Sequence, residues 1–256
     1  MAICGARLIW DDAVVLAGTG MPVLCAMLAQ KTRAPNAKIV YEGGNIDTRN
    51  KDLPLSVSDP RLMHNAAAAL DMRASLGELL QGGYIDIGFL GGAQVDKYGN
   101  INSTAIGRYK KPRVRLVGSG GANDIASLAN HTFIITRHEP RKLHSCDYLT
   151  SPGHLHGGDS RAKAGLLGEG PKYIITDLCI FDFHPKSKKS QLQLAPHPGR
   201  PGNHGLHHRP RTGASGILKP RPPLLRPGGT ILPRPPPPQQ KIKGHRFPAV
   251  VHPAAQ

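Results

Sequence analysis

The sequence predicts an α/β fold: an open, mostly parallel sheet with flanking helices. Three observations support this prediction. Short apolar runs recur between residues 11 and 183, glycine-rich turns follow several of them, and stretches with helical spacing separate them. Strands that alternate with helices are typical of a parallel sheet covered by helices. Ligands of such sheets bind beyond the carboxyl ends of the strands, so we expect the functional site at the glycine-rich turns.

The first elements follow one another closely along the chain. Residues 13–16 are all apolar and predict a buried strand, which runs into a glycine turn at 18–22. Apolar residues then recur at helical spacing until the proline-containing segment 34–36 ends that helix. Residues 38–41 predict the next strand, which ends at a glutamate followed by two glycines.

The next segment, residues 61–81, is predicted to be mostly helical. The apolar residues that would form its buried stripe are Leu62, Ala66, Ala69, Leu70, Leu76 and Leu79. Alternating apolar residues predict a strand at 85–89. Three more segments predict strands of the same sheet, at 114–117, 133–136 and 173–176.

Charge divides the chain into two parts. The 256 residues contain 33 Lys and Arg against 17 Asp and Glu, a net charge of +16, but no acidic residue follows Asp182. Residues 183–256 hold 13 of the basic residues and 16 of the 24 prolines. We therefore expect a folded domain over residues 1–185 and a basic, proline-rich tail over 186–256. The tail has too little apolar surface to offset the entropy of ordering, so we predict that it is disordered.

Several classes of protein are excluded by composition. The four cysteines form no CxxC pair, which argues against a disulfide scaffold or a zinc ribbon and favours reduced thiols in the cytoplasm. No run approaches the roughly 20 apolar residues that span a bilayer, so we expect no membrane association. Phe247 is the only aromatic residue after Phe183, so specific nucleic-acid binding by the tail is the least favoured function.

A metal site is also disfavoured. His154, His156 and Asp159 imitate metal ligands, but no fourth ligand is suggested, and a flexible loop after residues 151–153 is the better interpretation. We therefore expect no bound metal.

Four glycine-rich segments carry the candidate chemistry: residues 18–22, 41–44, 91–104 and 118–126. The first suits close approach of a ligand to backbone N–H groups, although a purely structural turn explains such a segment as well. The second places a carboxylate, Glu42, beside two glycines, where the alternative is a solvated strand end. Turn residues dominate the third.

The fourth segment, 118–126, has tandem glycines that can direct N–H groups at an anion. It lacks the Lys-Ser/Thr ending of a P-loop, which excludes an NTPase. Just before it, a basic cluster is formed by Lys110, Lys111, Arg113 and Arg115. This cluster is either a solvated face or a contact for the phosphates of a nucleotide-like ligand.

Taken together and in order, these segments resemble the beta subunit of family I CoA-transferases, and within that family the glutaconate CoA-transferase beta subunit. The resemblance rests on the sequences GTGMP, YEGG, GGAQVD with GNINST, and GSGGAN, followed by HE at 138–139, DYLTSPG at 147–153 and TD at 176–177. It implies a fold of the NagB/ribose-isomerase/CoA-transferase type. It also implies an obligate alpha subunit of similar fold.

The resemblance places Glu42 at the family's catalytic glutamate. It implies that CoA moves from an acyl-CoA donor to a carboxylic acid acceptor through a glutamyl-CoA thioester, with CoA as a substrate and no bound cofactor. The implied oxyanion and CoA-binding residues are Gly118, Gly120, Gly121 and Ala122. The implied substrate loops contain Gly18, Gly20, Gly43, Gly44, Gln94 and Asn100. The identity of the exchanged acids stays open.

The resemblance ends near residues 186–189, where the family continues with an acidic, helix-forming segment. We advance the hypothesis that the tail is a frameshift product, because plausible codons for 198–209, read one base over, yield a family-like sequence. Three alternatives remain: a same-fold acyl-CoA hydrolase, a decarboxylase, and an inactive subunit.

Overall fold

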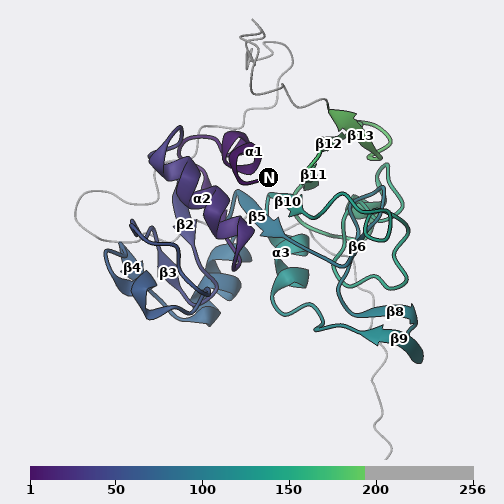
Figure 1. Ribbon diagram of the computed structural model, residues 1–256, viewed down its shortest axis with the longest axis horizontal. Coiled ribbons are helices and arrows are strands. Elements are labelled where there is room, and N and C mark those ends of the chain that lie inside the picture. The colour runs from purple at the N-terminus through teal and green to yellow at the C-terminus, as the bar shows by residue number, and fades with distance from the viewer. Residues whose placement is uncertain (194–256) are drawn as a thin grey trace, which may run out of the picture. The chain divides into compact units, whose positions relative to one another are not determined.

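The computed structural model of this protein describes residues 1–193 (Figure 1). Its main sheet has the strand order β13-β12-β11-β10-β5-β1-β2-β3-β4. The strands in chain order are β1 (Val14–Leu16), β2 (Lys38–Val40), β3 (Asn45–Ile46), β4 (Ala68–Ala69), β5 (Ile87–Leu90), β10 (His131–Ile135), β11 (Gly170–Ile175), β12 (Ile180–Phe183) and β13 (Ser190–Gln193).

The five central strands, β11, β10, β5, β1 and β2, pair in parallel, and both edges are antiparallel. This arrangement confirms the predicted fold class. Two small antiparallel sheets lie outside the main sheet. They consist of β6 (Gln94–Val95) with β7 (Ile101–Asn102), and β8 (Ala105–Arg108) with β9 (Lys111–Arg115).

Helices flank the sheet, as the predicted fold class requires. The α-helices are α1 (Ala2–Leu8), α2 (Met21–Lys31), α3 (Ala122–Leu128) and α4 (Ser160–Lys163), with a 3₁₀-helix η1 (Pro60–Met63) and a π-helix η2 (Arg73–Leu80). Helix α1 packs closely on α2, because a Cβ at Gly5 would lie 2.6 Å from Cys25 Sγ. Helix α3 approaches β5 in the same way, because a Cβ at Gly88 would lie 2.3 Å from Ile125 Cγ2. Glycine at both positions allows helix and neighbour to touch.

The core lies between the sheet and these helices. Val15, Ile39 and Phe133 are fully buried, and the Phe133 ring meets Phe89 edge to face with centroids 5.4 Å apart. Each large apolar side chain buried in this way stabilises the fold by about 1.5–3 kcal/mol. These residues belong to strands that the sequence predicts. Their burial holds the strands in place, and with them the turns that follow.

Two predicted elements are wrong. The segment 61–81 is not one helix: it contains η1, β4 and η2 in turn. Asn65 takes a left-handed conformation (φ 59°), and β4 then pairs with β3. Tertiary pairing thus overrides helical periodicity, and Ala69 of the predicted buried stripe is exposed.

The segment 114–117 does not join the main sheet either. Residues up to Arg115 belong to the exposed hairpin of β8 and β9, and Val117 is fully exposed. Lys111, Arg113 and Arg115 alternate with Pro112 and Val114, so one face is charged and the other carries few apolar side chains, and Val114 remains exposed.

The boundary predicted at residue 185 is too early. Ser190–Gln193 form β13, which pairs antiparallel with β12, so the described fold continues past the predicted start of the tail. The prediction of disorder and the frameshift hypothesis for residues 194–256 fall outside the described residues.

Candidate active site

The candidate site lies at the carboxyl ends of β1 and β2. Gly18 and Gly20 follow β1, and a positive φ of 87° at Gly20 turns the chain into α2. Glu42 lies in the four-residue turn that joins β2 to β3. The edge of the sheet thus brings together the first two glycine-rich segments, as the parallel topology requires.

The turn that carries Glu42 is held from both sides. Gly44 N–H donates to Tyr41 O at 2.9 Å, and the buried Ser75 hydroxyl donates to the backbone oxygen of Glu42 at 2.7 Å. Gly44 has a φ of 97°, and a Cβ there would lie only 2.0 Å from Leu70 O. Glycine is therefore required at this position. These contacts fix the Glu42 backbone, while its side chain stays half-buried.

The Glu42 carboxylate lies against the fourth glycine-rich segment. A Cβ at Gly121 would lie 3.3 Å from Glu42 Oε1 and 3.4 Å from Leu76 Cδ1. The absence of a side chain at Gly121 thus leaves room for the carboxylate. Burial raises the pKa of Glu42 above its ordinary value, because the charged form loses solvent.

The N–H groups of this segment divide into two pairs. Gly118 donates to Ser103 O at 2.9 Å, and Ala122 donates to Ser119 O at 3.0 Å. The N–H groups of Gly120 and Gly121 donate to no acceptor within residues 1–193. Of the four predicted oxyanion residues, only Gly120 and Gly121 therefore have a donor to offer, and Gly121 is the one beside Glu42.

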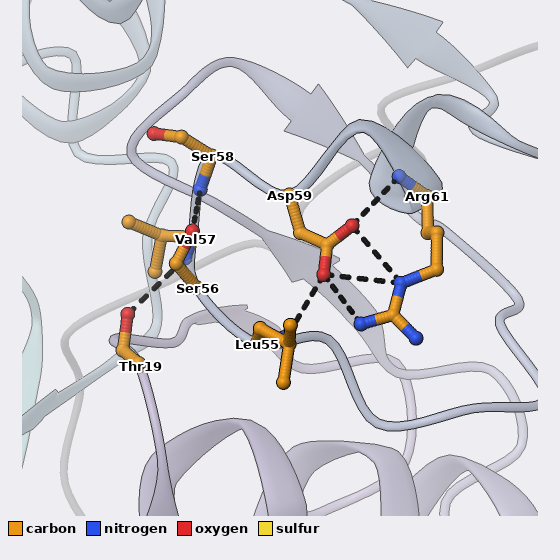
Figure 2. A network of polar contacts seen from close by, with 7 residues as sticks. All are labelled: Thr19, Leu55, Ser56, Val57, Ser58, Asp59 and Arg61. Atoms are coloured by element: carbon orange, nitrogen blue, oxygen red, sulfur yellow. Dashed lines mark hydrogen bonds and ion pairs between the residues drawn. The ribbon is translucent and has the colours of Figure 1, made fainter.

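Figure 2 shows a loop that the sequence patterns did not single out. Its centre, Val57, donates its N–H to Thr19 Oγ1 at 3.1 Å. The buried Asp59 carboxylate accepts from Leu55 N at 2.8 Å and from Arg61 N at 3.0 Å, and it pairs with the Arg61 guanidinium at 2.6 Å. The side-chain hydrogen bonds of Arg61 and the backbone N–H donors hold the pKa of Asp59 well below its usual range. This network pins the loop.

The pinned loop covers the turn beside Glu42. A Cβ at Gly43 would lie 3.1 Å from Val57 O, so Gly43 lets the loop approach the turn. Asp59 followed by Pro60 is a signal for the start of a helix, and it was available in the sequence. Ser75 carried no comparable signal, because its contact with Glu42 depends on the fold.

Gln94 and Asn100 do not contribute free polar atoms. Gln94 donates to Asp147 Oδ2 at 3.0 Å and accepts from Asp147 N at 2.9 Å. The Asn100 amide donates to Asp96 and to Leu155 O at 2.8 Å each, and it accepts from Gly153 N and Leu155 N. All four hydrogen-bonding positions of the buried Asn100 amide are occupied. We therefore assign both side chains to loop architecture rather than to substrate contact.

The segment 154–159 is also structural. His154 is buried and donates Nε2–H to Pro171 O at 2.8 Å, and burial lowers its pKa to about 4. Asp159 pairs with Lys163 at 3.0 Å. The described residues contain no group of three side chains placed to hold a metal ion. They also contain no helix long and apolar enough to cross a bilayer.

Two cavities lie away from Glu42. The larger, of about 530 Å³, is lined by residues that include Asp96, His138 and Phe181, and the smaller, of about 220 Å³, by residues that include His131 and Tyr173. Neither cavity is lined by Glu42 or by any of the glycines beside it.

Comparison with known proteins identifies the family. Residues 1–199 match the family described as "Coenzyme A transferase". The chain is 42% identical to the beta subunit of 3-oxoadipate CoA-transferase from Pseudomonas knackmussii over 201 residues, which cover 78% of this chain and 76% of the relative. It is 40% identical to the beta subunit of glutaconate CoA-transferase from Acidaminococcus fermentans over 75% of this chain and 74% of the relative.

Solved structures agree with these relatives. The crystal structure of the Acidaminococcus fermentans glutaconate CoA-transferase matches with a TM-score of 0.69 and 40% identity over 75% of each chain. The decarboxylase AibA/AibB matches with a TM-score of 0.63 at 24% identity, over 75% of this chain and 74% of that one, and shares the fold. With the family profile, the beta-subunit relatives and the solved structure in agreement, this chain belongs to the coenzyme A transferase family.

Proposed function

We propose that Glu42 is the nucleophile of a CoA-transferase and that CoA is its substrate rather than a resident cofactor. The observation that supports this proposal is the contact between the Glu42 carboxylate and the side-chain-free face of Gly121, at the open carboxyl edge of the sheet. A carboxylate in a partly desolvated site beside free N–H donors is suited to attack a thioester carbonyl.

The proposed steps conserve atoms and charge. The Glu42 carboxylate attacks the acyl-CoA carbonyl, expels CoA thiolate and forms a mixed anhydride. The thiolate attacks the glutamyl carbonyl, which gives an enzyme-CoA thioester and releases the donor acid. An acceptor carboxylate then attacks this thioester, and the same steps run in reverse. Each addition creates an oxyanion, for which the N–H groups of Gly120 and Gly121 are the proposed donors.

The acids that are exchanged belong, in our proposal, to the dicarboxylic class. Glutaconate and 3-oxoadipate, which the names of the two relatives specify, are both dicarboxylic acids. The relatives are about equally similar to this chain, so similarity does not favour one acid over the other.

The active enzyme, in our proposal, contains an alpha subunit. The relatives are named as B subunits of their CoA-transferases, which implies a second kind of subunit in each enzyme. We propose a cytoplasmic location, because all four cysteines are free thiols. We propose that neither nucleic acid nor a membrane takes part in this activity.

Trapping the glutamyl-CoA thioester tests the proposal. The chain is reconstituted with its alpha subunit and incubated with acyl-CoA and borohydride, which reduces a glutamyl thioester to the alcohol. We expect the mass change on the peptide that contains Glu42. Glu42→Gln should abolish the label and lower kcat by at least about 1,000-fold.

Glu78→Gln is the matched control, because Glu78 is exposed on η2 and should keep both label and activity. Transfer without a labelled Glu42 peptide would falsify the mechanism. Release of free CoA without exchange between acids would identify a hydrolase instead.

A further inference from the structure

The hairpin of β8 and β9, residues 105–115, carries the positive charge of the folded domain; we call it the basic hairpin. Its cations are Arg108, Lys110, Lys111, Arg113 and Arg115, and it contains no acidic residue. The rest of residues 1–182 has 15 basic and 17 acidic residues. Figure 1 shows the basic hairpin standing apart from the main sheet, and all five cations are exposed. A concentrated positive field of this kind attracts anions.

Within residues 1–193 these charges form no close ion pair, although Arg113 and Asp147 attract each other at longer range. In the part of the chain that the structure describes, none of the five forms an ion pair within 4.0 Å of a carboxylate. The nearby Asp147 accepts from Gly107 N at 2.8 Å and from Gln94 at 3.0 Å, which leaves it committed to the base of the hairpin. Residues 183–256 contain no Asp or Glu. No acidic side chain of the tail exists to neutralise the basic hairpin.

Planar groups lie beside the cations. The Tyr109 ring stacks on Tyr148 with centroids 4.9 Å apart and an angle of 21° between the rings. The Arg115 guanidinium lies 4.9 Å from the Tyr109 centroid. Tyr109 is half exposed even so. Aromatic rings and guanidinium planes are surfaces on which nucleobases stack, and Lys and Arg beside them bind phosphate.

The basic hairpin is joined directly to the Glu42 site. Leu116 N donates to Thr104 O and Gly118 N to Ser103 O, both at 2.9 Å, and these bonds close the base of the hairpin. The chain then reaches Gly121, which touches Glu42. The five residue-to-residue steps from Leu116 to Gly121 span at most about 18 Å, at roughly 3.5 Å per step. This span suits a ligand with a reactive end at Glu42, an extended arm and an anionic, nucleotide-like end.

We propose that the basic hairpin binds the phosphates of the nucleotide end of CoA, with the adenine against the planar groups of Tyr109, Tyr148 or Arg115. The inference rests on the proposed function, because it takes CoA as the ligand whose thiol reacts at Glu42. The proposed subsite differs in chemical character from the site at Glu42. The glycine-rich edge handles the reacting carbonyl, and the basic hairpin holds the end of CoA that does not react.

The test compares two thioesters of the same acid in the reconstituted enzyme. One is the acyl-CoA, and the other is the acyl-pantetheine, which lacks the phosphates and the adenosine. Lys110→Glu/Lys111→Glu changes two exposed side chains at the tip of the basic hairpin. We expect KM for acyl-CoA to rise at least 10-fold, with a smaller rise at high salt, while kcat and the KM for acyl-pantetheine change less than about two-fold.

Lys31→Glu, at the exposed end of α2, is the charge-reversal control and should leave both substrates unaffected. An unchanged KM for acyl-CoA overturns the inference, as does an equal rise for both thioesters. Loss of the alpha subunit from the variant on size-exclusion chromatography overturns it too, because the basic hairpin would then be a docking surface for that subunit.

A direct binding measurement separates this inference from the proposed function. Calorimetric titration of the Glu42→Gln enzyme with CoA needs no chemistry at Glu42. If the wild-type enzyme lacks transferase activity but CoA binding is still lost in Lys110→Glu/Lys111→Glu, the function fails and the CoA subsite stands. If CoA binds to Lys110→Glu/Lys111→Glu as tightly as it binds to the Glu42→Gln enzyme, the proposed subsite is wrong, whatever the transferase activity.

Discussion

The turn around Glu42 and the loops around Asn100 have similar sequences, rich in glycine and polar residues, but they differ in how their polar atoms are used. Around Asn100 every amide position has a partner within the chain. Beside Glu42, the N–H groups of Gly120 and Gly121 bond to nothing in residues 1–193, and the carboxylate lies against a bare Cα. Unused hydrogen-bonding capacity, rather than residue type, distinguishes the candidate site from its supporting structure.

Among changes to the surroundings of Glu42, we expect the largest effect from filling the space at Gly121. Gly121→Ala places a methyl group 3.3 Å from Glu42 Oε1 and 3.4 Å from Leu76 Cδ1, so the carboxylate must shift by a few tenths of an ångström to make room. We expect kcat to fall by up to about 100-fold, because the reacting carboxylate is moved out of its attacking position. Steady-state kinetics of the reconstituted enzyme measures this change.

Gly77→Ala provides the comparison for Gly121→Ala, because a Cβ there meets only the flexible Arg73 side chain, at 3.9 Å. It should retain full kcat. Equal activity of the two variants would show that Gly121 is an ordinary turn residue.

At Asn100 we expect a substitution to lower stability rather than activity. Asn100→Ala leaves the N–H groups of Gly153 and Leu155 without their acceptor and removes the donor to Leu155 O. We expect a loss of about 2–4 kcal/mol in the free energy of unfolding. Urea denaturation measures it, and kcat per folded enzyme should stay near the wild-type value.

Asn36→Ala serves as the matched change, because Asn36 is exposed and should cost less than about 1 kcal/mol. A specific loss of kcat in Asn100→Ala with unchanged stability would return Asn100 to the substrate site.

The smallest effect is a displacement of the pH profile. Burial raises the pKa of Glu42 above 4.5, and attack needs the ionised form, so kcat/KM should fall as the pH drops through this raised value. The acid limb of the profile should therefore lie above the ordinary pKa of a glutamate. The same shift means that ionised Glu42 costs folding free energy at neutral pH, so Glu42→Gln should raise Tm there.

An acid limb at or below 4.5 would contradict the burial of Glu42 in the assembled enzyme. A Glu42→Gln variant with a lower Tm would show that the carboxylate has a stabilising partner in the complex.

The parallel strands and the glycine motifs were predictable, because both depend on local pattern. Residues 13–16 and 133–136 are apolar enough to be strands in any α/β arrangement, and Glu42 followed by two glycines marks a turn. The segment 61–81 was not predictable, because β4 forms only where β3 is present to pair with it. Local periodicity carries no information about such a partner.

The supporting contacts of the site were equally hidden. Ser75 lies 33 residues from Glu42 in the chain, yet it holds the Glu42 backbone. The sequence alone leaves the Asn100 amide available to a substrate, whereas in the fold its oxygen accepts from Gly153 N and Leu155 N. The family resemblance predicts the role of Glu42, and the structure shows that the N–H groups of Gly120 and Gly121 have no acceptor within residues 1–193.

The tight turn between β2 and β3 has a kinetic consequence. Glu42 lies in a four-residue connection that is closed by two hydrogen bonds, from Gly44 N to Tyr41 O and from Tyr41 N to Asn45 O at 3.0 Å. The connection is too short for the Glu42 backbone to move between two separate substrate positions. In the proposed mechanism both acids must then use one place in succession. Either acid can then occupy that place in the free enzyme and exclude acyl-CoA, so we expect an excess of either acid to inhibit turnover in competition with acyl-CoA.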